Sequence, residues 1–131
     1  MKTITVAAAI IMNDKNELLL VRKKNTRVFM QVGGKLEPNE APEIAIQREI
    51  LEEIGSTCDI KQYLGRYETA TANEPDHQLI SHLFVVELHQ QPEIAAEIAE
   101  MKWIDLHEAE ILTLWEKAQK GEKLNKIEPL K

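Results

Sequence analysis

A helical pattern over residues 41–55 interrupts a chain that otherwise consists of strand-like segments. Pro42 stands early in this pattern and Gly55 directly follows its last turn, which is typical of the two ends of a helix. A second amphipathic helix is predicted over residues 107–120. The predicted strands cover residues 3–12, 18–21, 28–32, 60–70, 79–88 and 101–106. This order of strands, helix, strands and helix predicts an α+β fold with a mixed β-sheet between helices.

Turn residues refine the first half of this prediction. Residues 14–16, Asp-Lys-Asn, separate the first two strand segments, so we expect those segments to pair as a hairpin. The third strand segment is expected to end at the pair Gly33-Gly34.

The composition bounds the class of protein. Of the 131 residues 44% are hydrophobic and 29% are charged, which is ordinary for a single globular domain over residues 1–131. The longest apolar run, residues 6–12, falls well short of the ~18 residues that cross a bilayer, and it lacks the pattern of a signal peptide. Cys58 is the only cysteine, so an intrachain disulfide is excluded and a cytoplasmic location is expected.

The negative charge is concentrated in one short segment. The formal net charge is −6, and residues 37–53 contain six glutamates and one arginine. The remainder of the chain is almost neutral, with 15 basic and 16 acidic residues. This distribution argues against a nucleic-acid polymer as partner and directs the search for function to residues 37–53.

Within the predicted helix, Glu49, Glu52 and Glu53 fall on one side of a helical wheel. The aliphatic stripe that we expect to face the core consists of Ile44, Ile50, Leu51 and Ile54. An acidic helix face in water is common, because like charges at this spacing cost only ~0.2–0.5 kcal/mol. In a cleft, two carboxylates ~6 Å apart repel by roughly 3 kcal/mol unless a cation neutralises them. Oxygen ligands suit Mg²⁺, Mn²⁺ or Ca²⁺, so the residues leave open a metal site or a solvated acidic face.

The residues around the helix resemble a known signature. Residues 34–56 read G-x5-E-x7-R-E-I-L-E-E-I-G-S, which resembles the Nudix hydrolase signature G-x5-E-x7-R-E-U-x-E-E-x-G-U, where U is aliphatic. All seven fixed letters match in frame. At ~5–7% usage per residue type, seven chance matches have a probability of order 10⁻⁹ per window. Ser56 replaces the last aliphatic residue, which is a packing position after the helix.

The resemblance extends from about residue 3 to residue 120. It implies a Nudix-type α/β/α sandwich with the signature on a loop-helix-loop, and cleavage of a nucleoside diphosphate linked to another group with Mg²⁺ or Mn²⁺. Glu40 and Arg48 would form an ion pair that holds the loop against the helix. The implied metal ligands are Glu49, Glu52, Glu53 and the backbone carbonyl of Gly33, with one glutamate orienting or deprotonating the attacking water.

In the family that this signature resembles, a further acidic metal ligand often comes from a loop before a later strand that carries a tryptophan. Glu97 lies six residues before Trp103 and is the preferred candidate, with Glu93 and Glu100 as alternatives. The other reading of residues 92–100 is an acidic loop or a short helix. In that reading Ile94 and Ile98 pack inward.

Four residues near the glycine pair are candidates for substrate binding. Lys35 and Arg22 could place positive charge near phosphate groups, although each is also an ordinary surface cation. Phe29 and Gln31 could contact a nucleobase, although a core position is the alternative for an aromatic residue.

The substrate class is an expectation from the resemblance. The short chain resembles the MutT-like housekeeping members, which act on nucleoside triphosphates, so nucleoside di- or triphosphates, including oxidised ones, are the leading small-molecule substrates. The alternatives are a non-catalytic module that senses a nucleotide, and a hydrolase of a non-nucleotide diphosphate. Family members are often dimers, and the sequence leaves a homodimer open.

Overall fold

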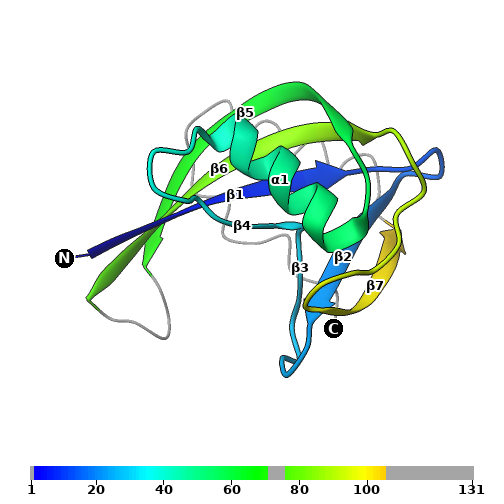
Figure 1. Ribbon diagram of the computed structural model, residues 1–131, viewed down its shortest axis with the longest axis horizontal. Coiled ribbons are helices and arrows are strands. Elements are labelled where there is room, and N and C mark those ends of the chain that lie inside the picture. The colour runs from blue at the N-terminus through cyan, green and yellow to red at the C-terminus, as the bar shows by residue number, and fades with distance from the viewer. Residues whose placement is uncertain (1, 71–75, 106–131) are drawn as a thin grey trace.

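The computed structural model describes residues 2–70 and 76–105, which form one helix and two β-sheets (Figure 1). The first sheet has the strand order β4-β1-β6-β5 and the second has the order β3-β2-β7. The elements are β1 (Lys2–Ile11), β2 (Glu17–Lys23), β3 (Phe29–Met30), β4 (Gly33–Lys35), α1 (Pro42–Ile54), β5 (Cys58–Ala70), β6 (His77–Leu88) and β7 (Ile98–Asp105). The predicted helix over residues 107–120 lies outside the described residues.

The first sheet is mixed, as predicted. β1 runs parallel to β6, from the pair Lys2–His77 to the pair Ile11–Val86, while β4 and β5 pair antiparallel with their neighbours. Helix α1 packs across one face of this sheet against β1, β4 and β5 (Figure 1). No helix in the described part of the chain is long and apolar enough to span a membrane.

The predicted hairpin between the first two strands is wrong. β1 and β2 belong to different sheets, and in the described residues one isolated bridge, Met12 to Leu18, joins the two segments. The chain does reverse between them: the Asn13 side chain accepts hydrogen bonds from the Lys15 and Glu17 amides. Turn residues predict only that the chain reverses direction. They do not predict which strands pair, because pairing depends on the packing of the other strands. Here β1 pairs with β4 and β6, and β2 with β3 and β7.

The glycine pair forms a strand of its own and does not end the preceding one. Gly33 lies opposite Ala8 and Gly34 opposite Ala7 in the antiparallel pair of β4 with β1. A Cβ atom on Gly33 would come within 2.1 Å of the Ala7 carbonyl oxygen. The backbone can therefore approach β1 only because this position has no side chain.

Alternate residues of β1 contribute to two separate cores, as expected for a strand that is buried on both faces. Ala7, Ala9 and Ile11 belong to the helix-side core, which also contains the buried residues of α1. Ile10 belongs to the second core. The other fully or nearly buried residues of the second core are Leu18, Leu20, Leu64, Tyr67 and Leu83.

The predicted buried face of the helix is partly wrong. Ile44 and Leu51, which we expected in the core, are 57% and 54% exposed. The buried residues of α1 are Ala45, Ile46, Ile50, Glu53 and Ile54. Because α1 has aliphatic side chains on both sides, the wheel does not decide which side meets the sheet. The helix is rotated so that Glu53, which we expected on the solvated side, faces inward.

Candidate active site

Arg48 holds the loop before α1 against the helix. Its Nε and Nη2 atoms each donate a hydrogen bond of 2.8 Å to a different carboxylate oxygen of Glu40. Hydrogen bonds from Arg48 and from the Glu37 amide lower the pKa of Glu40 to about 2. The structure therefore joins the two residues in the ion pair that the resemblance implies, in the bidentate geometry that favours arginine.

The same guanidinium group reaches three further oxygen atoms. Nη1 donates to Glu49 Oε1 at 2.8 Å and to Glu52 Oε2 at 3.4 Å, and Nη2 donates to the carbonyl of Lys35 at 3.1 Å. The Glu49 side chain is 13% exposed and the Glu52 side chain is 53% exposed. Arg48 thus neutralises part of the acidic cluster and orients two of its three predicted ligands.

Glu53 occupies a different environment from its two neighbours. Its side chain is 8% exposed, accepts a hydrogen bond of 3.1 Å from the Gly33 amide, and lies 3.9 Å from Lys23 Nζ. Burial raises the pKa of Glu53 to about 7, and the hydrogen bond from Gly33 and the charge of Lys23 offset this only in part. A buried carboxylate with this little compensation is costly in its charged form.

The second glycine of the pair makes room for Glu49. A Cβ atom on Gly34 would lie 2.6–2.8 Å from the carboxylate atoms of Glu49, so that carboxylate rests directly on the Gly34 backbone. Gly33, in contact with Glu53, and Gly34, in contact with Glu49, therefore bring β4 against the acidic side of α1. This arrangement is the structural reason for glycine at position 34 of the signature.

The remaining signature positions terminate the helix. Gly55 has a φ of 68° and its amide donates to the carbonyl of Leu51 at 3.1 Å, which is the left-handed cap expected at the end of a helix. Ser56, in place of an aliphatic residue, is completely buried, and its hydroxyl donates to the Thr57 carbonyl at 2.6 Å.

The carboxylates do not converge on one point in this conformation. Within residues 2–70 and 76–105, no group of three or more His, Cys, Asp or Glu side chains is placed to hold a metal ion. The reason is visible in the contacts, since Glu49 and Glu52 turn their oxygens to Arg48 while Glu53 turns to Gly33. The donor chemistry, carboxylate and carbonyl oxygen, nevertheless fits a hard divalent cation.

The loop with the predicted downstream ligand reaches the C-terminal end of α1. The Ala95 amide donates to the carbonyl of Glu53 at 3.0 Å, and the Lys24 amide donates to the carbonyl of Glu97 at 2.8 Å. These bonds bring the backbone of the loop beside Glu53, while the Glu97 side chain is exposed. Residues 92–97 form a loop and Ile98 begins β7, so the short helix is absent from the described residues 92–100. Ile98 is buried as predicted, but Ile94 is 47% exposed.

The two residues predicted to bind phosphate, Arg22 and Lys35, have different surroundings. Arg22 Nε donates to Glu100 Oε1 at 3.1 Å, and Arg22 Nη1 donates to the carbonyl of Thr26 at 2.8 Å. Lys35 is exposed at the end of β4. Glu100 is therefore a partner of Arg22 across the second sheet.

The predicted base-contacting residues lie away from the carboxylates. Phe29 packs against the second core, on the face of β1 opposite to α1. The Nζ atom of Lys102 lies 4.0 Å from the centre of the Phe29 ring, which is a cation–π geometry. Gln31 is half-buried between β3 and β4.

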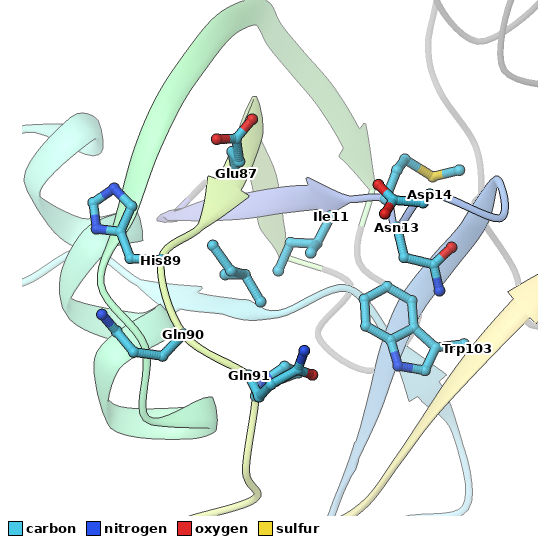
Figure 2. A pocket seen from close by; sticks show the side chains of 11 residues that line it. Ile11, Asn13, Asp14, Glu87, His89, Gln90, Gln91 and Trp103 are labelled. Atoms are coloured by element: carbon cyan, nitrogen blue, oxygen red, sulfur yellow. The ribbon is translucent and has the colours of Figure 1, made fainter.

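A cavity of about 460 Å³ lies between the C-terminal ends of β1 and β6 and Trp103 of β7. None of the described predicted site residues lines it. In Figure 2, His89 and Gln90 turn toward α1, whereas Asn13 and Trp103 lie on the opposite side of this cavity. The cavity and the acidic cluster are therefore separate features.

Sequence reasoning missed Lys23, whose Nζ atom lies 3.9 Å from the Glu53 carboxylate. A usable signal existed in the alternation of β2: Val21 is fully buried in the helix-side core, and Lys23 follows it on the same face of the strand.

Comparison with known proteins identifies the family. The NUDIX domain profile matches residues 1–124. A relative from Bacillus subtilis (strain 168) is 32% identical over 100 residues, which are 75% of this chain and 64% of that protein, so this chain spans just under two thirds of its length. The 8-oxo-dGTP diphosphatase of Escherichia coli (strain K12) is 30% identical over 112 residues, which are 81% of this chain and 83% of that enzyme.

A solved structure shows the same fold. The crystal structure of the MutT protein from Methanosarcina mazei Go1 matches with a TM-score of 0.70 at 22% identity, over 91% of this chain and 94% of that chain. The seven matching fixed letters of the signature, the domain match over residues 1–124 and this shared fold show that the chain belongs to the Nudix hydrolase family.

Proposed function

We propose that this protein, as one Nudix domain over residues 1–131, catalyses the attack of water on a phosphoanhydride bond of a nucleoside di- or triphosphate, with Mg²⁺ or Mn²⁺ as cofactor. The observation that carries the proposal is Glu53, a nearly buried carboxylate whose pKa is raised to about 7. Lys23, 3.9 Å away, offsets the cost of this buried charge only in part, and a cation bound beside Glu49 and Gly33 would offset it further.

The proposed ligands are Glu49, Glu52, Glu53 and the carbonyl of Gly33, with Glu97 as a further ligand. When bound, the cation would neutralise phosphate charge and lower the pKa of a bound water. In this proposal Glu49 and Glu52 leave Arg48 Nη1 and turn toward Glu53 when the cation binds. Arg48 would stay in place through its two bonds to Glu40, which do not involve Nη1.

Lysine and arginine side chains of this protein would contact the phosphate groups of the substrate. Lys23 lies at the edge of the acidic cluster and Lys35 is exposed at the end of the strand that carries both glycines. Arg22 would first have to leave Glu100, which is 53% exposed and holds it by one contact of 3.1 Å. An ion pair this exposed contributes little to stability, so a phosphate could replace it.

The proposed substrate class is supported by a relative. The Escherichia coli relative is named for the hydrolysis of 8-oxo-dGTP, an oxidised nucleoside triphosphate. Oxidised and ordinary nucleoside triphosphates are therefore the first substrates to test.

The test is release of phosphate and pyrophosphate from a panel of nucleoside di- and triphosphates, nucleotide sugars and non-nucleotide diphosphates. Release from one nucleotide class that needs Mg²⁺ or Mn²⁺ and stops with EDTA supports the proposal. Release from a diphosphate without a nucleobase would replace the substrate class. Tight metal-dependent binding of a nucleotide without any release would favour a sensor instead of an enzyme.

The proposal extends to location and assembly. We place the protein in the cytoplasm because its only cysteine, Cys58, is free and buried. Light scattering at the concentration of the activity assay would decide between a monomer and a homodimer.

A further inference from the structure

The connection between β6 and β7, residues 89–97, runs along the C-terminal end of α1. Its Glu93 amide donates to the carbonyl of Ile54 at 2.9 Å, and its Ala95 amide donates to the carbonyl of Glu53 at 3.0 Å. The far end of the connection is held by the bond from the Lys24 amide to the carbonyl of Glu97. The path of residues 89–97 therefore decides where the end of α1, with Glu53, lies relative to Glu97.

The near end of this connection is held by a reciprocal pair of hydrogen bonds, which we call the Ser56–Gln90 clasp. The Gln90 amide donates to Ser56 Oγ at 3.1 Å, and the Gln90 side-chain oxygen accepts from the Thr57 amide at 2.9 Å. The adjacent bond from the His89 amide to the Thr57 carbonyl, at 2.9 Å, continues the pairing. Figure 2 shows the Gln90 side chain turned toward α1 and away from Trp103.

The clasp depends on the one position at which this chain departs from the signature. An aliphatic side chain at position 56 offers no oxygen to the Gln90 amide, whereas Ser56 is completely buried and supplies one. The hydroxyl itself is satisfied, because it donates to the Thr57 carbonyl at 2.6 Å. The buried Ser56 hydroxyl is thus hydrogen-bonded, as buried polar side chains generally are, and it also lies 3.3 Å from Gln90 Oε1.

We propose that the Ser56–Gln90 clasp is a positioning device that fixes residues 89–97 against α1 and so sets the distance between Glu53 and Glu97. This inference rests on the proposed function, in which both glutamates are metal ligands. Ser56 and Gln90 contact neither metal nor substrate in this account. They act through the backbone of residues 89–97, which contains Glu97 and is hydrogen-bonded to the end of α1 at Glu53.

The experiment compares Gln90→Ala and Ser56→Ala with two controls. Gln90→Glu keeps an acceptor oxygen for the Thr57 amide and serves as the conservative variant. Gln91→Ala removes the neighbouring amide side chain, which is not one of the groups that form the clasp. Hydrogen exchange of the Glu93 and Ala95 amides is measured in metal-free protein, and Mn²⁺ binding without nucleotide is measured by electron paramagnetic resonance.

The clasp predicts at least about tenfold faster exchange at the Glu93 and Ala95 amides in Gln90→Ala and Ser56→Ala, because local opening of the connection becomes easier. It also predicts about tenfold weaker Mn²⁺ binding, as when partners that orient metal ligands are removed. Gln90→Glu and Gln91→Ala should resemble the wild type in both readouts.

Two outcomes would overturn the inference. Unchanged exchange in Gln90→Ala would show that the clasp does not hold the connection. Faster exchange with unchanged Mn²⁺ affinity would show a purely structural role for the clasp. A wild-type protein that binds Mn²⁺ and obeys both predictions but hydrolyses no nucleotide would support the clasp and overturn the proposed function instead.

Discussion

At the scale of single residues, the site is defined by the contrast between Glu53 and Glu40. Glu53 lies on α1 and Glu40 in the loop before it, yet burial raises the pKa of Glu53 to about 7 whereas Arg48 lowers the pKa of Glu40 to about 2. The bidentate partner stabilises one charge, and the scarcity of partners leaves the other available to a cation. Titratable groups pushed in opposite directions are typical of functional sites.

Glu53 gives the metal-free protein a pH dependence of defined sign. Its pKa rises from an ordinary 4.5 to about 7 on folding, so between these values the folded state binds more protons than the unfolded state. The free energy of unfolding therefore falls as the pH rises through this window, by at most about 3 kcal/mol. Urea unfolding in EDTA at pH 5 and pH 8 should show this loss in the wild type and not in Glu53→Gln. The same loss in both proteins would contradict it.

The same substitution should separate stability from catalysis. We expect Glu53→Gln to lower turnover at least about a hundredfold, because a metal ligand and its charge are lost, while the variant unfolds no earlier than the wild type at pH 8. Glu52→Gln should lose similar activity. Glu43→Gln, on the first turn of α1, is the matched control and should keep full activity. Wild-type turnover in Glu52→Gln and Glu53→Gln would remove the ligand assignment.

The sequence predicted the charged residues of this cluster better than their surroundings. The resemblance implies that Glu40 pairs with Arg48, and only seven residues of one loop and helix separate the two. It cannot predict that Lys23 lies 3.9 Å from Glu53, since that contact depends on how β2 packs beside α1.

At the scale of elements, the two signature glycines 34 and 55 have different physical roles. Gly34→Ala would push the Glu49 carboxylate, the flexible end of a side chain, so we expect a small change in stability but a ten- to hundredfold loss of turnover, about the effect of a misplaced catalytic group. Gly55→Ala would place an alanine at a φ of 68° and cost about 1 kcal/mol of stability. Thermal unfolding and turnover of both variants check this contrast. Equal losses of turnover would contradict it.

The loop before α1 should depend on one ion pair. Glu40→Gln is expected to lower the melting temperature by several degrees at pH 7, whereas Glu37→Gln, whose 64% exposed carboxylate lies 3.7 Å from Arg48, should have little effect. A lowered pKa stabilises the fold above the ordinary value of 4.5, and this contribution is lost as the pH falls toward 2. The deficit of Glu40→Gln should therefore shrink in thermal unfolding at pH 3. A constant deficit would argue against the pair.

The errors of sequence analysis at this scale share one cause. Local patterns correctly predicted that α1 ends before Gly55 and that the chain reverses after β1. They failed for Ile44 and Leu51, because α1 has aliphatic residues on two sides and only the sheet decides which side is buried. They failed for the hairpin because strand partners are chosen across the whole molecule.

At the scale of the whole molecule, the candidate site lies where separate parts of the chain meet. Helix α1 supplies the carboxylates, β4 the glycines, β2 the lysine, and residues 89–97 the loop beside Glu53. The signature predicts the first two contributors, since they lie within one segment of the chain. The other two come from the second sheet and its connection, whose placement the sequence pattern does not encode locally.

The most direct test of this account is turnover of one responsive nucleotide against Mn²⁺ concentration, in the wild type, Glu53→Gln and Glu43→Gln. The account predicts saturable activation of the wild type and of Glu43→Gln, no turnover in EDTA, and for Glu53→Gln a turnover at least about a hundredfold lower at every Mn²⁺ concentration. Turnover that persists in EDTA, or a Glu53→Gln variant that Mn²⁺ activates like the wild type, would contradict it.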